Sequence, residues 1–286
     1  MLRLGRHTFD ADQPLMMAIV NRTRDSFYDQ GATYDDGPAQ ERVQRVVEEG
    51  AEIVDIGGVR AGYGEQVDAA EEIRRVVPFV AWVREQHPGV VISVDTWRAE
   101  VAREVCEAGA DLLNDAWGGH DPGLVEVAAE FGTAIVCTHT GGLLPRTDPY
   151  RIEYDDVVAA AIAETTALAE RALAAGVARE SIVIDPAHDF GKNTFHSLEV
   201  TRRLDEMVAT GWPVLVSLSN KDFVGETLGA PTQERLTGTL AATSVCALAG
   251  ARIYRVHQVP ETRQTVEMVW SIAGRRPPLR AIRGLQ

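Results

Sequence analysis

The segment 181–193, SIVIDPAHDFGKN, runs from an apolar stretch straight into two acids, a histidine and a Gly-Lys pair. The apolar stretch is typical of a buried strand, so the polar side chains follow at its carboxyl end. A buried carboxylate is costly unless a hydrogen-bond donor meets it, and Asp185 has the parity of an inward-facing side chain. The segment therefore indicates a site for a polar ligand.

The residue spacing argues against three other kinds of site: a P-loop, a dinucleotide-binding motif and a zinc site. The Gly-Lys pair is not a P-loop, because Pro186 and Asn193 stand where that motif needs a glycine and a hydroxyl residue. The Gly-Tyr-Gly triplet at 62–64 lacks the third glycine of a dinucleotide motif. The acids and histidine of 185–189 could ligate a metal, but no second His/Asp cluster has zinc-like spacing.

Polar side chains also end the other strand candidates of the chain. They are Asn21, Asp55, Asp95, Asn114 with Asp115, His139, Ser219 with Lys221, and Arg255 with His257. Alternation along a strand gives Asp55, Asp95 and Asp185 the inward parity, and Arg255 shares its parity with His257. The inward acids favour N–H donors, whereas the Arg-His pair favours an anion. The pattern implies a flat, donor-rich heterocycle that carries a phosphate or pyrophosphate.

The elements that must position these side chains repeat as strand followed by helix. Strands are predicted at 15–20, 51–58, 90–96, 111–115, 134–140, 181–187, 213–220 and 252–259. Helices are predicted at 38–50, 68–86, 98–109, 123–131, 155–175, 197–210, 232–250 and 261–273. Eight such units favour a TIM (β/α)8 barrel, an α/β fold, over a doubly wound open sheet, which has the same alternation.

No linker divides the chain, so residues 1–286 are expected to form one domain. Residues 2–9 are expected to form a short hairpin around Gly5 that caps the barrel bottom. The basic tail after 273 is expected to be solvated and packed on the outer helices.

Composition limits the class of protein. The 286 residues are 45% apolar, which is enough for a large core, and the net charge of −14 argues against nucleic acid and anionic membrane as partners. No apolar run is long enough to predict a transmembrane helix, and the first residues lack an apolar signal core. The three cysteines are far apart and suit reduced core thiols, so a cytoplasmic protein is expected.

Several of these strand ends occur in longer motifs. They are MAIVNRTRDSF (17–27), DIGG (55–58), ISVDT (92–96), LLND (112–115), IDP with FGK (184–186 and 190–192), LSNK (218–221) and GARIYRVHQV (250–259). Together they resemble the dihydropteroate synthases over nearly the whole chain. That family is a TIM barrel that joins 6-hydroxymethyl-dihydropterin pyrophosphate to p-aminobenzoate, with Mg²⁺, in folate biosynthesis.

The resemblance implies roles for particular residues. It implies a pterin-holding set made of Asp95, Asn114, Asp185 and Lys221. It also implies that Arg255 and His257 bind the pyrophosphate and that Asn21 belongs with the Mg²⁺.

Two of the loops depart from the family pattern in their charged and stiffening residues. The usual DIGGESTRPG reads DIGGVRAGYG here, so the hydroxyls and the arginine of that loop are replaced by Arg60, Ala61 and Gly62. The usual NVTPDSF reads NRTRDSF, so Arg22 and Arg24 replace a valine and the proline that would stiffen the loop. These arginines could return some of the lost positive charge.

Two more departures lie closer to the strand ends. The usual SRK reads SNK, so Asn220 removes a cation beside the p-aminobenzoate site. The usual DPGIGFGK reads DPAHDFGK, which puts His188 and Asp189 where an apolar residue and a glycine are expected. The pattern resembles the second, divergent dihydropteroate synthase paralogue of actinobacteria, which is regarded as inactive in folate synthesis.

Four functions remain open at this point. The first is a pterin-binding homologue of the synthase with little or no activity, and the second is a working synthase whose arginines replace the lost cations. The third is another pterin-barrel enzyme, such as a methyltetrahydrofolate methyltransferase, and the fourth is a non-enzymatic dimeric scaffold. The small-residue stretch 237–251 allows close helix packing, either on the barrel or in a homodimer.

Overall fold

The computed structural model describes residues 1–23, 31–60, 62, 64, 66–147 and 152–284. Arg24 and Ala61, two of the positions at which the loops depart from the family pattern, lie outside the described residues.

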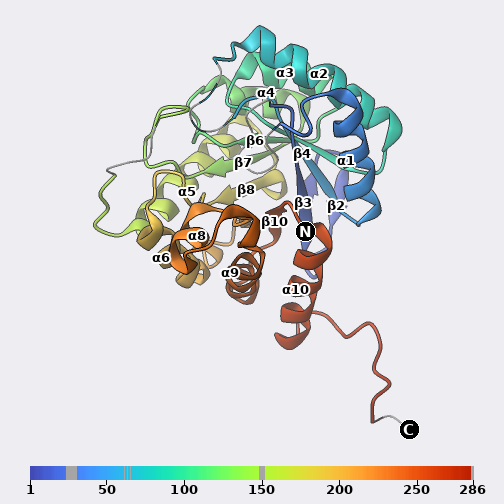
Figure 1. Cartoon of the computed structure of the whole chain (residues 1–286). Coiled ribbons are helices and arrows are strands. Elements are labelled where there is room, and N and C mark those ends of the chain that lie inside the picture. The colour runs from blue at the N-terminus through green and yellow to red at the C-terminus, as the bar shows by residue number, and fades with distance from the viewer. Residues whose placement is uncertain (24–30, 61, 63, 65, 148–151, 285–286) are drawn as a thin grey trace.

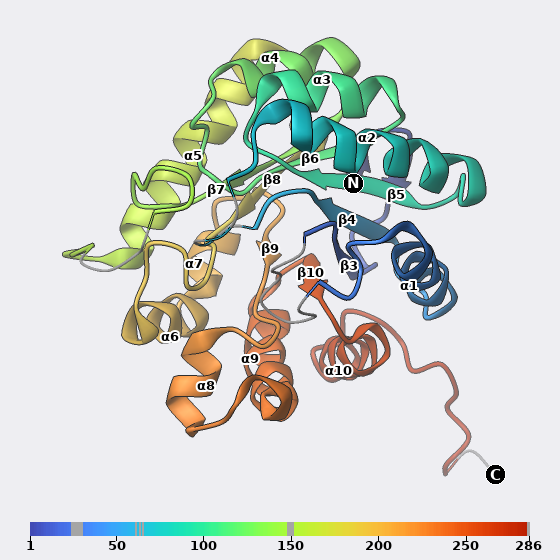
Figure 2. The same ribbon diagram turned by 45° about the horizontal axis from the view of Figure 1, so that its top comes forward.

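A parallel sheet curls into a barrel at the centre of the molecule, with helices outside it (Figures 1 and 2). Within the described residues its strands are β3 (Leu15–Asn21), β4 (Ile53–Gly57), β5 (Val91–Asp95), β6 (Leu112–Asp115), β7 (Ala134–Thr138), β8 (Ile182–Asp185), β9 (Leu215–Val216) and β10 (Ile253–Val256). Their order is β8-β7-β6-β5-β4-β3-β10-β9. A single parallel bridge from Ile184 to Val214 brings the two edges together. The barrel prediction is confirmed, and the open sheet is excluded.

The surrounding helices follow the strands in the predicted alternation. In the described part of the chain they are α1 (Asp36–Glu48), α2 (Ala69–Gln86), α3 (Ala99–Glu107), α4 (Gly123–Phe131), α5 (Val157–Ala175), α6 (Thr194–Arg202), α7 (Leu204–Val208), α8 (Asp222–Leu228), α9 (Leu236–Ala249) and α10 (Val259–Ile272). Two turns of 3-10 helix are added, η1 (Arg179–Ser181) and η2 (Thr232–Glu234). None of the described helices is long and apolar enough to cross a membrane.

Local chemistry explains where the longer helices begin and end. Asp68 caps α2 by accepting from the backbone N–H of Glu71, and Asp156 caps α5 by accepting from Val158. Gly176 ends α5 at φ 105°, a left-handed position that favours glycine.

The strands divide the core into two layers, as their alternation requires. One parity, including Met17, Ile53 and Val183, fills the barrel interior. The other parity, including Ile92 and Ile184, packs under the helices. Because Asp185 is two residues after Val183, its side chain continues the interior row, as predicted.

Two of the predicted helices differ in detail from the observed ones. The helix predicted at 197–210 is split into α6 and α7 at Arg203, whose guanidinium binds Glu199, Glu206 and Asp156. The helix predicted at 232–250 begins only at Leu236.

Helix α8 was missed, because its seven residues include a helix-weakening glycine. A side chain at that position, Gly225, would collide with the guanidinium of Arg235.

The hairpin predicted at 2–9 is present at the bottom of the barrel. Strands β1 (Leu2–Leu4) and β2 (His7–Phe9) pair antiparallel, and Leu2 and Leu4 pack against the interior row. Gly5 turns the chain at φ 55°, where a Cβ would lie 2.7 Å from the side chain of Asp111. Arg275 donates to the carbonyls of Ala247 and Leu248 in α9, and Arg276 pairs with Glu267 in α10, so the start of the tail packs on the outer helices as expected. Residues 277–284 are exposed, so the rest of the tail is solvated but does not pack on them.

Candidate functional site

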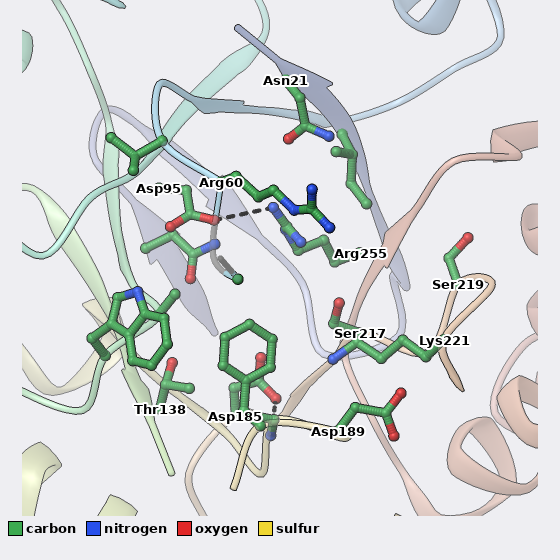
Figure 3. Close-up of a pocket in the computed structure, with 18 of the residues that line it drawn as sticks. Asn21, Arg60, Asp95, Thr138, Asp185, Asp189, Ser217, Ser219, Lys221 and Arg255 are labelled. Atoms are coloured by element: carbon green, nitrogen blue, oxygen red, sulfur yellow. Dashed lines mark hydrogen bonds and ion pairs between the residues drawn. The ribbon is translucent and has the colours of Figure 1, made fainter. Parts of the chain in front are cut away.

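A pocket of about 350 Å³ opens at the carboxyl ends of the strands (Figure 3). It is lined by the seven residues to which the family resemblance assigns a role: Asn21, Asp95, Asn114, Asp185, Lys221, Arg255 and His257. All seven therefore lie at one mouth of the barrel, while the roles that the resemblance implies for them stay predictions. Each comes from a different loop or strand end, except Arg255 and His257, which share β10 and the turn after it.

Asp55 lies beneath this pocket and does not line it. The carboxylate is fully buried and accepts from Ser93 Oγ at 2.6 Å, from Asn114 Nδ2 at 3.3 Å and from Arg255 Nε at 2.6 Å. The expectation that all three inward acids meet the ligand is therefore corrected. Asp55 instead fixes the orientation of two side chains above it.

Arg255 joins this buried acid to the floor of the pocket. Its Nη2 donates to Oδ2 of Asp95 at 3.2 Å, the contact drawn in Figure 3. Burial raises the pKa of Asp95 to about 7, although the charge of Arg255 opposes the shift. Asp95 is thus poised to exchange a proton near neutral pH, and much of the charge of Arg255 is already balanced inside the protein.

Asp185 and Lys221 form the opposite side of the floor. Oδ1 of Asp185 accepts from the backbone N–H of Ala187 at 2.7 Å. Lys221 Nζ donates to the carbonyl of His188 and lies 4.9 Å from the centre of the Phe190 ring. Burial raises the pKa of Asp185 and lowers that of Lys221, and the two opposite charges counter these shifts.

An apolar wall completes the pocket, and the sequence had given these residues no role. Trp117 packs edge-on against Phe190, with ring centroids 5.5 Å apart, and against Trp97 at 6.3 Å. Val59 and Leu143 join the same cluster and also line the pocket. A flat ring on the polar floor would therefore meet aromatic faces at its side. The only sequence signal was an aromatic residue shortly after a polar strand end.

His257 faces the pocket as a neutral ring. Burial, with the charges of Arg255 and Arg42, lowers its pKa to about 3. Its Nδ1 lies 2.9 Å from Ser219 Oγ, and that oxygen also accepts from the backbone N–H of His257. His257 can offer a ligand a hydrogen bond but no positive charge.

Two polar strand-end residues turn away from the pocket. Asp115 accepts from the backbone N–H groups of Trp117 and Gly119 and so shapes its own loop. His139 is buried on the helix side of β7, and Thr138 lines the pocket in its place. The reason is alternation, since each stands one residue from an inward-facing position.

The substituted arginines do not act as one group. Arg22 Nη2 pairs with Asp36 at 2.5 Å, and its guanidinium lies 4.6 Å from the centre of the Phe79 ring, so Arg22 does not line the pocket. Arg60 does line it, and Figure 3 shows its side chain beside that of Arg255. Of the described arginines at altered loop positions, Arg60 is therefore the one placed to meet a ligand.

The altered loop after β8 is fastened to the neighbouring helices. Asp189 lines the pocket at φ 68°, and its carboxylate accepts from Ser197 Oγ at 3.0 Å and from the backbone N–H of Phe223 at 3.3 Å. His188 is fully buried outside the pocket and stacks on the ring of Phe223. His188 therefore shapes the wall from behind, whereas Asp189 forms part of the wall itself.

Three comparisons place this geometry among known proteins. A profile of pterin binding enzymes matches residues 17–257. The chain is 61% identical over 278 residues to "Inactive dihydropteroate synthase 2" of Mycobacterium tuberculosis, covering 96% of this chain and 87% of that protein. It is 37% identical to the dihydropteroate synthase of Escherichia coli, covering 92% of this chain and 93% of that one. A Yersinia pestis dihydropteroate synthase, solved with a sulfonamide drug complex, superposes with a TM-score of 0.90 at 35% identity, covering 96% of this chain and all of that one.

The chain therefore belongs to the pterin binding enzyme family. Within that family it is a homologue of the dihydropteroate synthases. The relatives from Mycobacterium tuberculosis and Mycobacterium leprae, at 61% and 60% identity, are both named as inactive.

Proposed function

We propose that the protein binds a pterin-like ligand in this pocket and has little or no synthase activity. The observation that carries the proposal is the contrast between the pocket floor and its loops. The polar floor keeps Asp95, Asn114, Asp185 and Lys221 together, whereas the cations of the two substrate loops are changed.

The floor suits the polar edge of a pterin. Asp95 and Asp185 would accept from the ring N–H groups, and Asn114 offers both a donor and an acceptor. Lys221 would donate to a ring acceptor while it balances Asp185. The flat face of the ring would then lie near Trp117 and Phe190 on the wall.

The other end of the pocket suits a phosphate or pyrophosphate. Arg60 brings positive charge there, and His257 adds a neutral donor. Arg255 adds a guanidinium whose charge is partly balanced by Asp55 and Asp95. No cluster of three or more His, Cys, Asp or Glu side chains fit for a metal occurs among the described residues. An Mg²⁺ would therefore be held by Asn21 with phosphate oxygens and waters, a donor set that fits this hard cation.

Weak catalysis follows from the loops. Stabilising a departing anion is a large part of such a reaction, and it needs cations held in place. Arg22 is turned to Asp36, and Asn220 carries no charge. Arg60 is the feature that favours the second candidate, a working synthase, because it returns one guanidinium to the pocket.

Calorimetry tests the binding proposal directly. Titration with 6-hydroxymethylpterin pyrophosphate and Mg²⁺ should give saturable binding with one ligand per chain. Absence of binding would overturn the proposed function whatever the activity.

We also propose that the protein is a homodimer that buries the outer face of α9 and α10. The two helices carry four exposed apolar side chains: Val245, Leu248, Met268 and Ile272. Part of the small-residue stretch 237–251 packs inward within the same chain, and a dimer is not needed to explain it. These buried residues are Thr239, Thr243, Cys246 and Ala247. A single domain spanning 1–286 and a cytoplasmic location remain proposals, and the buried free thiols of Cys106, Cys137 and Cys246 support the latter.

A further inference from the structure

Lys192 is one of only two lysines in the chain, against 26 arginines, and the other is Lys221 in the pocket. Its side chain is almost completely buried and does not line the pocket. Its Nζ donates to the carbonyls of Phe190 at 2.9 Å, of Ala187 at 3.2 Å and of His139 at 3.4 Å, and lies 2.6 Å from His139 Nδ1. A compact ammonium, unlike a guanidinium, can meet acceptors on several sides at once.

His139 acts as an acceptor in this group. Burial, with the charge of Lys192, lowers the pKa of His139 to about 3, so the ring is neutral. Nδ1 can then accept from the ammonium, which leaves the ring proton on Nε2, 3.6 Å from Oε2 of Glu164. The lysine thus ties the end of β7 to the loop after β8.

That loop forms one side of the pocket and has a demanding backbone. Ala187, Asp189, Phe190 and Gly191 all line the pocket. Ala187 and Asp189 have φ angles of 51° and 68°, left-handed values that are strained for a residue with a Cβ. Gly191 is also left-handed, and a Cβ there would lie 2.3 Å from the carbonyl oxygen of Thr140. A segment with this backbone persists only if its surroundings hold it.

We propose that Lys192 is a positioning residue of the pocket: its charged ammonium, out of reach of the ligand, holds residues 187–191 in the form that binds the pterin. The proposal rests on the proposed pterin binding. When the ammonium loses its proton it has one donor fewer and no charge, so two buried carbonyls are held less firmly.

The charge on this lysine is sensitive to pH. Burial lowers the pKa of Lys192 to about 7, although Asp185 opposes the shift. The charged groups that act on it are Asp185 of β8, Lys221 at the start of α8, Glu164 of α5 and Asp189 of its own loop. The neutral His139 faces it from the end of β7, and His196 of α6 feels its charge.

The direction in which pH changes the contacts of Lys192 follows from these pKa values. The holding contact is complete below about pH 7 and is lost as pH rises through that value. Asp95 titrates in the same window with the opposite effect, because its ionised form accepts better from a ligand. A comparison between variants at each pH removes the Asp95 contribution, since both proteins share it.

The test measures the Kd of 6-hydroxymethylpterin by calorimetry from about pH 6 to about pH 8.5 for the wild type and Lys192→Met. The variant should bind about tenfold more weakly at the low end, and the ratio of the two Kd values should shrink as the pH rises. Equal Kd values throughout, or a constant ratio at every pH, would overturn the role of the charge. A wild type that binds no pterin at any pH would instead overturn the proposed function.

A second measurement avoids any variant. With labelled lysine, the two Nζ signals report the titration of Lys192 in the wild type. Amide-exchange protection of Asp189 and Phe190, corrected for intrinsic rates, should fall as Lys192 loses its proton. Protection that stays constant across that titration would contradict the proposal even if Lys192→Met does not fold.

Discussion

At the residue scale, Asp185 carries the most specific expectation. Asp185→Asn keeps the shape of the side chain and one oxygen that can accept from Ala187. It removes the charge beside Lys221 and turns one acceptor into a donor toward the ligand. We expect pterin binding to weaken by about 1–3 kcal/mol, the range for leaving a buried partner unsatisfied. Calorimetry of the two proteins checks this, and equal affinities would remove Asp185 from the pterin site.

Asp111→Asn is the control for Asp185→Asn, because it makes the same chemical change at the opposite end of the barrel. Asp111 is buried and accepts from Arg6 Nε at 3.0 Å, from the backbone N–H of Ile92 at 3.0 Å and from Arg84. The loss of this carboxylate should lower the free energy of unfolding by about 1–3 kcal/mol, measured with urea, and leave pterin affinity unchanged. Weaker pterin binding in this variant would show that the affinity loss in Asp185→Asn can arise from destabilisation of the fold and not from a lost contact to the ligand.

The residues that could be predicted are those whose position follows from alternation. Asn21, Asp95, Asp185 and Arg255 were correctly placed because a strand fixes which face each side chain takes. Asp55 had the right parity, but its depth in the barrel depends on the stagger of the strands, which no single strand contains.

At the element scale, the loop after β4 contributes Val59, Arg60 and Gly62 to the lining of the pocket. Gly62 lines the pocket, has no left-handed backbone, and a Cβ there would lie 3.8 Å from Arg60 Nε, an ordinary contact. The position therefore accepts a side chain. Ala61→Thr with Gly62→Arg restores the family residues and should raise synthase turnover about tenfold for each 1.4 kcal/mol of recovered stabilisation.

A matched control for this loop is Gly64→Arg, which adds the same charge two residues away. If both arginine variants raise turnover equally, charge alone acts and the position does not matter. If neither does while both bind pterin, the defect lies outside this loop, with the substituted residues after β8 as the next candidates.

Elements differ in how far their sequence determines them. The strands and the long helices were predicted because apolar spacing recurs over many residues. Helix α8 was not predicted, because it has only seven residues and one of them is Gly225. A glycine is required there because a side chain would collide with Arg235, which lies outside the helix. Tertiary contact also decided the break at Arg203, where three acids hold one guanidinium.

At the scale of the whole molecule, the outer face of α9 and α10 tests the proposed dimer. Leu248→Glu places a charge at a side chain that is 58% exposed, so the fold of the monomer should be unaffected. If that face is buried in a homodimer, sedimentation should show a dimer for the wild type and a shift toward monomer for the variant. A wild type that sediments as a monomer would contradict the proposed dimer.

The central claim is that the barrel keeps a pterin pocket while its altered loops no longer support the reaction. The most direct measurement is the rate at which the wild type joins labelled p-aminobenzoate to 6-hydroxymethyl-dihydropterin pyrophosphate. Pterin binding is measured in the same sample, and the Escherichia coli enzyme is assayed beside it. Two lost interactions of about 1.4 kcal/mol each predict a rate at least about 100-fold below that enzyme, with pterin binding retained. A rate comparable to that of the Escherichia coli enzyme would contradict the account.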